Sequence, residues 1–185
     1  LQNKLNLKSY FSNQGFFNTK VITNYISKNQ RGIDIYKIET NNPYTLDSIY
    51  FKTNNLVLDS IYKLNYKNKL LINGKKFGTV DFENERNRIY DLFRNSGIYD
   101  FQLNSVNFDV KIDSTAKSFD LPVVINVRNK VENIDGIQNE IPYKISKINK
   151  VKVFIGKNDS LDYNFIEDYE DLSIYSKSNL KYNKD

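Results

Sequence analysis

An internal repeat constrains the fold of this chain more than any other feature of the sequence. When Gly15 is aligned with Gly97, 82 residues further on, residues 7–17 match the end of the longer run at 85–101. Each copy is followed by two β-like runs and then by a Pro-Tyr pair, at 43–44 and at 142–143. A repeat of this kind is typical of tandem modules, which usually bind or space other molecules rather than catalyse reactions.

The composition excludes several classes of function. The 185 residues include no Cys and no His, which excludes thiolate–imidazole catalysis and the usual zinc ligands. The sequence contains no glycine-rich phosphate loop, activated nucleophile or carboxylate pair in contrasting environments, so we expect neither an enzyme nor a cofactor. The acidic cluster at residues 167–171 lacks the alternating loop and the glycine of a calcium site, so we expect no bound metal.

Charge and hydropathy bound the possible partners. The formal net charge is +5 with both signs interspersed, which favours an ordinary solvated surface over attraction to an anionic partner such as nucleic acid. The mean hydropathy of −0.60, with no apolar run of about 20 residues, excludes a membrane-spanning helix. The chain opens on Leu1, a few residues before a helix end, and contains no Met, so we expect it to be part of a longer protein.

The first copy of the repeat predicts a helix at residues 1–13 followed by a hairpin. Gly15, like Gly97 in the second copy, is predicted to be a structural helix stop with positive φ. The core-facing positions of the helix are Leu5, Tyr10 and Phe11. The hairpin strands are residues 21–28 and 33–39, with the turn at 29–32.

The second copy is longer and opens with a predicted strand at residues 44–52 and a helix at 55–66. A second helix begins at Thr79 or Asp81, either of which can cap it, and ends at Gly97. Its buried stripe consists of Phe82, Ile89, Leu92 and Phe93.

Arg86 and Arg88 lie on the polar side of this helix. A surface salt bridge to Glu83 or Glu85 explains them better than contact with a partner. The 14 Tyr and 12 Phe residues fall mostly at core-facing positions, which favours packing over stacking on bases or sugars.

Residues 105–113 predict a half-buried strand, because polar and apolar side chains alternate along them. The side chains expected on the buried face are Val106, Phe108, Val110 and Ile112. Residues 119–128 predict its partner strand, with Pro122 near the start, where the missing N–H is tolerated.

The rest of the chain reads as a polar linker at residues 130–140 and the opening strand of a further module at 143–155. Residues 156–185 do not continue like the second copy. We expect an irregular, acidic and tyrosine-rich insertion there, with room for a short added strand.

These elements predict an α+β fold built from modules of the order strand–helix–helix–strand–strand. Because the crossover between parallel strands is right-handed, the last strand can lie between the other two, with both helices on one face of a three-stranded mixed sheet. We expect three domains: the C-terminal part of a first module at 1–41, a complete module at 42–130, and the start of a third at 141–185.

In order and spacing the chain resembles the POTRA domains of the BamA/TamA superfamily of outer-membrane assembly factors. The second helix carries the most specific part of the resemblance, and matching segments open two successive modules. The segments concerned are GKKF at 74–77, ERNRI at 85–89, NSGIYDF at 95–101, PYTLDSI at 43–49 and PYKISKI at 142–148. The acidic, tyrosine-rich stretch at 159–175 resembles an insertion of Bacteroidota members.

The resemblance implies a periplasmic scaffold, tethered to the outer membrane through a C-terminal membrane barrel of the parent protein. Its partners would be unfolded outer-membrane protein substrates and accessory assembly proteins, which add a strand to an exposed sheet edge. POTRA regions of two-partner secretion transporters or division proteins stay open as alternatives, as does a basic module that binds an anionic polymer, either nucleic acid or polysaccharide.

If the last strand of the module fills the centre of the sheet, the strand at residues 105–113 lies at an edge. We therefore predict this strand as the docking site, with charged outward side chains that discourage self-pairing. The predicted partner-binding residues are Ser105, Asn107, Asp109, Lys111 and Asp113.

Overall fold

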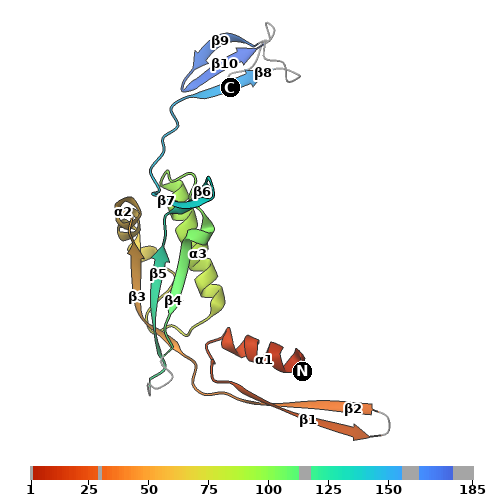
Figure 1. Cartoon of the computed structure of the whole chain (residues 1–185). Helices are drawn as coiled ribbons and strands as arrows, with labels where there is room; N and C mark the ends of the chain where they lie inside the picture. The colour runs from red at the N-terminus through yellow and green to blue at the C-terminus, as the bar shows by residue number, and fades with distance from the viewer. Residues whose placement is uncertain (1, 29–30, 113–117, 156–162, 177–185) are drawn as a thin grey trace. The chain divides into compact units, whose positions relative to one another are not determined.

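The computed structural model describes residues 2–28, 31–112, 118–155 and 163–176 (Figure 1). The chain divides into two compact units, Leu1–Ile145 and Ser146–Asp185, and each is described by itself. Helices and both parallel and antiparallel strand pairs occur, so the predicted α+β class is confirmed.

The centre of the first unit is a three-stranded mixed sheet with two helices on one face (Figure 1). Its strands are β3 (Thr45–Thr53), β4 (Val106–Val110) and β5 (Asp120–Val127), in the order β3-β5-β4. The helices α2 (Leu56–Leu64) and α3 (Thr79–Asn95) follow β3 in the chain. Because β5 is parallel to β3 and antiparallel to β4, the last strand does occupy the centre, as predicted.

Burial along β5 shows which face the helices cover. Every second side chain of this strand is at most 2% exposed, and the residues between them face water. The buried side chains of β5 are Leu121, Val123, Ile125 and Val127, and those of the helices include Leu58, Tyr62, Phe82, Ile89 and Phe93. These side chains belong to one cluster that contains most of the buried apolar residues. Full burial of one such side chain stabilises a fold by roughly 1.5–3 kcal/mol.

The edge strand is shorter than the sequence predicts. β4 ends at Val110, whose partner is Val123, rather than at residue 113. Pro122 lies beyond this last pair, so β4 requires no N–H from it.

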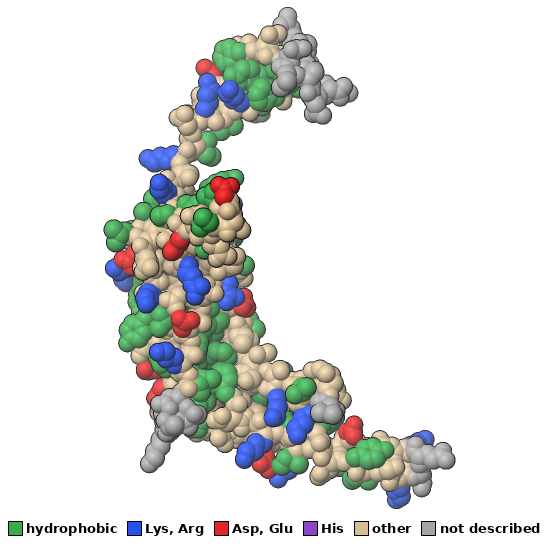
Figure 2. All heavy atoms as spheres, in the orientation of Figure 1, with side chains coloured by type: hydrophobic (Ala, Val, Ile, Leu, Met, Phe, Trp, Pro, Cys, Tyr) green, Lys and Arg blue, Asp and Glu red, His purple; other side chains and the backbone are tan. Residues whose placement is uncertain are grey.

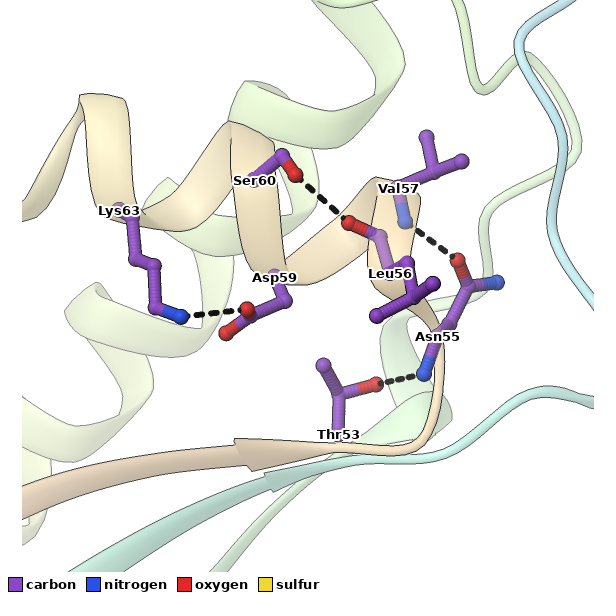
Figure 3. Close-up of polar contacts among 7 residues, drawn as sticks. All are labelled: Thr53, Asn55, Leu56, Val57, Asp59, Ser60 and Lys63. Atoms are coloured by element: carbon purple, nitrogen blue, oxygen red, sulfur yellow. Dashed lines mark hydrogen bonds and ion pairs between the residues drawn. The ribbon is translucent and has the colours of Figure 1, made fainter.

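A side-chain cap starts α2. The Oδ1 atom of Asn55 accepts a hydrogen bond from the Val57 N–H at 3.0 Å (Figure 3). Asp59 and Lys63 form an ion pair across one turn of the same helix (Figure 3). A short 3-10 turn, η1 (Tyr66–Asn68), follows the helix, and another, η2 (Leu103–Ser105), precedes β4.

The start of α3 differs from the prediction, whereas its end agrees. The N-cap is Gly78 and no side chain caps it, so neither Thr79 nor Asp81 has that role. Asp81 instead pairs with Lys75 at 2.8 Å. Gly97 has φ +91°, which confirms the predicted glycine stop.

The first copy of the repeat forms a helix and a hairpin. These elements are α1 (Gln2–Ser12), β1 (Lys20–Lys28) and β2 (Arg31–Glu39), and the two strands pair antiparallel, as predicted. The predicted core positions Leu5 and Tyr10 are wrong, because their side chains are 54% and 62% exposed.

Gly15 joins this first copy to the central sheet. Its φ of +86° confirms the predicted stop, and its carbonyl accepts a hydrogen bond from the Tyr44 N–H at 2.9 Å. The rings of Phe17 and Tyr44 lie 5.2 Å apart. A Cβ on Gly15 would lie 3.2 Å from Phe77 atoms. Both the positive φ and this close approach therefore favour glycine at position 15.

The predicted linker at residues 130–140 is wrong. These residues form the hairpin of β6 (Lys130–Ile134) and β7 (Ile137–Ile141). Asp135 and Gly136 both have positive φ, at +54° and +82°, which is the two-residue turn that suits the twist of paired strands.

The predicted strand at 143–155 is wrong over its first half. Tyr143 is buried in the first unit, with its ring 4.8 Å from that of Phe101 and its hydroxyl 2.7 Å from the Ser105 hydroxyl. Residues 144–150 have no helix or strand.

The second unit is a three-stranded sheet. Its strands are β8 (Val151–Ile155), β9 (Asn164–Tyr169) and β10 (Leu172–Ser176), in the order β8-β10-β9. β10 is parallel to β8 and antiparallel to β9, which repeats the pattern of the central sheet. Where an irregular insertion was expected, the described residues therefore form two strands; the expectations for 156–162 and 177–185 lie outside the described residues.

Candidate functional site at the free edge of β4

β4 lies at an edge of the central sheet. Its one partner among the described residues is β5, so one side of its backbone faces no other strand. The opposite edge, on β3, is partly covered. Leu46 exchanges backbone hydrogen bonds with Lys75 and Gly74, at 2.8 and 2.6 Å, and the Phe77 N–H donates to Tyr44 at 2.9 Å. β4 is therefore the more open edge for an added strand.

The register of β4 shows which of its backbone groups face outward. The Arg128 N–H donates to the Ser105 carbonyl at 3.0 Å, and Val106 lies opposite Val127. In an antiparallel pair this arrangement makes Val106 a non-hydrogen-bonded position, so the next residue, Asn107, exchanges its hydrogen bonds with β5. Asp109 does the same two residues later, because the pattern alternates.

The groups that face the free edge therefore belong to Phe108 and Val110. The side chains of these two residues and of Val106 pack on the core beneath the helices. Asn107 and Asp109 present their side chains on the opposite face, where Asp109 accepts a hydrogen bond from the Asn126 amide. An added strand would thus bind the backbone of Phe108 and Val110 without displacing a core side chain.

The five predicted partner-binding residues do not provide the open backbone groups at the free edge of β4. Ser105 is 5% exposed and lies in η2, so it presents no open edge. Asn107 and Asp109 direct their backbone groups to β5, which corrects the expectation that they carry the docking hydrogen bonds. Lys111 is exposed but follows the end of β4, and Asp113 lies outside the described residues. No local sequence signal shows which β4 residues pair with β5 and which face the free edge, because the alternation of hydrogen bonds depends on the register with β5.

A groove of about 880 Å³ lies beside the start of β4, between α3 and η2, and the sequence reasoning missed it. Its floor includes the buried side chains of Phe101 and Val106, and Leu103 is exposed at its wall. The lining from α3 is Arg86, Asn87 and Tyr90. A mostly apolar groove with a few polar groups at its rim is typical of sites that hold one side chain or a small molecule.

Arg86 connects the groove to the edge. Its Nε donates to the Val106 carbonyl at 3.2 Å, and its guanidinium carbon lies 5.3 Å from the centre of the Phe108 ring. The same guanidinium pairs with Glu83, as the sequence predicted for a surface salt bridge.

The described residues show no other constellation that suggests chemistry. No group of three acidic side chains among them is placed to hold a metal ion. None of the helices in this part of the chain is long and apolar enough to cross a membrane. On the face drawn in Figure 2, Lys and Arg side chains are interspersed with Asp and Glu, without one large patch of either sign.

No family model matches the chain, and no curated protein matches its sequence. Among solved structures it is similar to BamA from Haemophilus ducreyi lacking POTRA domains 1–3, with 14% identity and a TM-score of 0.38, over 70% of this chain and 23% of that one. It is also similar to POTRA domains 3–5 of BamA from Haemophilus influenzae, with 12% identity and a TM-score of 0.40, over 95% of this chain and 78% of that one.

This chain therefore spans less than a quarter of the first of these proteins. The central module has the elements that the sequence predicts. The central sheet has the strand order β3-β5-β4, the helices α2 and α3 cover one face, and α3 ends on a glycine of positive φ. The central module thus has the predicted order strand–helix–helix–strand–strand, with its last strand in the centre of the sheet.

Proposed function

We propose that this chain is a polypeptide-binding scaffold region of an outer-membrane protein assembly or translocation factor. In this proposal an extended segment of an unfolded outer-membrane protein, or of an accessory assembly protein, adds a strand to the free edge of β4. The observation that carries the proposal is that the N–H and C=O groups of Phe108 and Val110 face an edge with no partner among the described residues.

Strand addition suits a scaffold that handles many substrates. The affinity comes from backbone hydrogen bonds, which every extended polypeptide can form, and the alternate side chains add limited selectivity. The helices hold the edge strand in place because its apolar side chains are anchored beneath them. The edge can therefore accept a visiting strand while the core stays unchanged.

The cellular setting belongs to the proposal as well. The sequence resemblance to POTRA domains supports a periplasmic location and a parent protein tethered to the outer membrane, and the central module has the strand order expected from that resemblance. The division of the chain into a partial module at 1–41, a complete module from 42 and a further module that begins after Tyr143 is likewise proposed. No catalytic role is proposed.

Two proline substitutions on β4 test the docking edge. Val110→Pro removes an outward N–H, so we expect loss of binding to extended outer-membrane-protein peptides with most of the fold retained. Asp109→Pro is the matched control, because it removes an N–H that pairs with β5 and should destabilise the sheet itself. Peptide binding is measured by amide chemical-shift perturbation, and the fold by thermal unfolding.

The proposal fails if peptide perturbs the helices while the amides of β4 stay silent, or if Val110→Pro binds as well as the original chain. Binding that falls steeply with salt and does not involve β4 would point instead to an anionic polymer as the partner.

A further inference from the structure

The free edge of β4 is closed at one end. Both backbone groups of Val106 are occupied within the module: its N–H donates to the Leu103 carbonyl, and its C=O accepts from Arg86 Nε at 3.2 Å. Phe108 and Val110 follow with no such partners among the described residues. A strand that pairs along this edge therefore meets its last open groups at Phe108.

The groove begins where the edge closes, since Val106 and Arg86 belong both to the closed end and to the groove lining. A peptide that leaves the edge after Phe108 would direct its next side chain toward this groove. The floor there consists of Phe101 and Val106, which are 2% and 1% exposed, and Leu103 is exposed beside them.

The charge of the groove indicates which side chain fits. Arg86 is the one charged residue of its lining, and its guanidinium is already paired with Glu83. The other polar residues of the lining are all uncharged: Asn87, Tyr90, Gln102, Asn104 and Asn107. A charged side chain would lose water there without gaining an opposite charge, whereas a large apolar side chain would cover the buried floor.

We propose that Arg86 sets the register of a docked strand and that the groove selects a large apolar side chain at the position where the strand leaves the edge. The inference rests on the proposed function, because it assigns a register and a side-chain preference to the same docking edge. Arg86 is a positioning residue here. Because it donates to the Val106 carbonyl, a docked strand cannot pair with that carbonyl, and this determines which peptide residue lies at the groove.

A positional scan of one side chain tests this inference. The probes are short Thr- and Ser-based peptides that differ only in the position of a single Phe. We expect the original chain to bind one position in the series about tenfold more tightly than its neighbours, which corresponds to burial of part of one aromatic ring. In Arg86→Ala that preference should disappear or move by two residues, the spacing of edge-facing backbone groups.

Two further variants keep the test interpretable if Arg86→Ala folds poorly. Leu103→Asn alters the groove wall but not the edge, so it should lower the preference for Phe without moving its position. Lys63→Ala removes a cation that, like Arg86, pairs with a carboxylate on its own helix, but it lies on α2 away from the groove lining and should change nothing.

The outcomes separate this inference from the proposed function. If no peptide of the series binds, the proposed function fails. If all peptides bind equally and perturb Phe108 and Val110, strand addition stands and the register and groove assignment is overturned. The assignment is also overturned if Arg86→Ala keeps the original preference at the original position, or if Leu103→Asn leaves its strength unchanged.

Discussion

At the scale of single residues, two neighbouring ion pairs on α3 differ in a way that their spacing does not reveal. Arg86 and Arg88 were both expected to form surface pairs. The pair of Arg86 with Glu83 is of that kind, whereas the carboxylate of Glu85 is fully buried. Glu85 accepts two hydrogen bonds from Arg88, at 2.8 and 2.7 Å, and one from the Leu70 N–H at 2.8 Å. The buried carboxylate thus connects the loop after η1 to the helix.

Tyr62 lies beside this ion pair, with the Arg88 guanidinium carbon 5.8 Å from the centre of its ring. Its ring stacks on Phe51 with centres 3.8 Å apart, and its hydroxyl is buried without a hydrogen-bond partner. Burial first, and then the negative charge of Glu85, raises the pKa of Tyr62, so the phenol stays neutral throughout the ordinary pH range.

We therefore predict unequal effects of removing the two acidic residues. Glu85→Ala leaves the Arg88 guanidinium partly buried without its partner, and should lower the free energy of unfolding by about 3 kcal/mol. Glu83→Ala is the matched control on the same helix; its carboxylate is 60% exposed, and its loss should change the free energy by less than about 1 kcal/mol. Urea denaturation measures both, and equal effects of the two substitutions would contradict the assignment.

At the scale of elements, the segment after β5 closes the central module rather than linking it to the next. The hairpin of β6 and β7 brings the chain back to the module, where the Tyr143 ring packs on Phe101. The Asn55 side chain, which caps α2, also donates to the Tyr143 carbonyl at 3.0 Å. A residue 16 positions beyond the last core strand therefore completes the core.

This placement predicts where the module can be truncated. A chain that ends at residue 130 loses the Tyr143 ring and should be less stable than one that ends at 145, and Tyr143→Ala should reproduce most of the loss, about 3 kcal/mol. Tyr50→Ala is the control, because the Tyr50 side chain is 60% exposed on β3 and should matter little. Thermal unfolding compares these chains. Equal melting temperatures for the two truncated chains would show that Tyr143 does not stabilise the module.

At the scale of the whole molecule, the chain consists of two units that share a strand pattern. The sheet of the second unit repeats the order and directions of the central sheet, although only residues 156–163 separate β8 from β9. The units meet in a stretch without helix or strand at residues 144–150. A boundary in such an exposed connecting stretch is typical of separately folded units.

Limited proteolysis should detect this boundary. Lys144, Lys147 and Lys150 are exposed in the connecting stretch, so brief trypsin treatment should cleave there and release a stable fragment that ends near residue 145. Mass spectrometry identifies the fragment. Early cleavage within β4 or β5, with the connecting stretch intact, would contradict the division into these units.

The features that could be predicted from the amino-acid sequence are those that depend on local conformation and periodicity. Gly15 and Gly97 were identified as helix stops because the left-handed conformation at a helix end favours glycine wherever it occurs. The alternation in β4 and the order of elements likewise predicted the sheet and its central strand. In contrast, the structure was needed to show which β4 backbone groups face outward and that Glu85 and Tyr143 are buried. These features depend on register and packing between segments far apart in the chain, which no local pattern encodes.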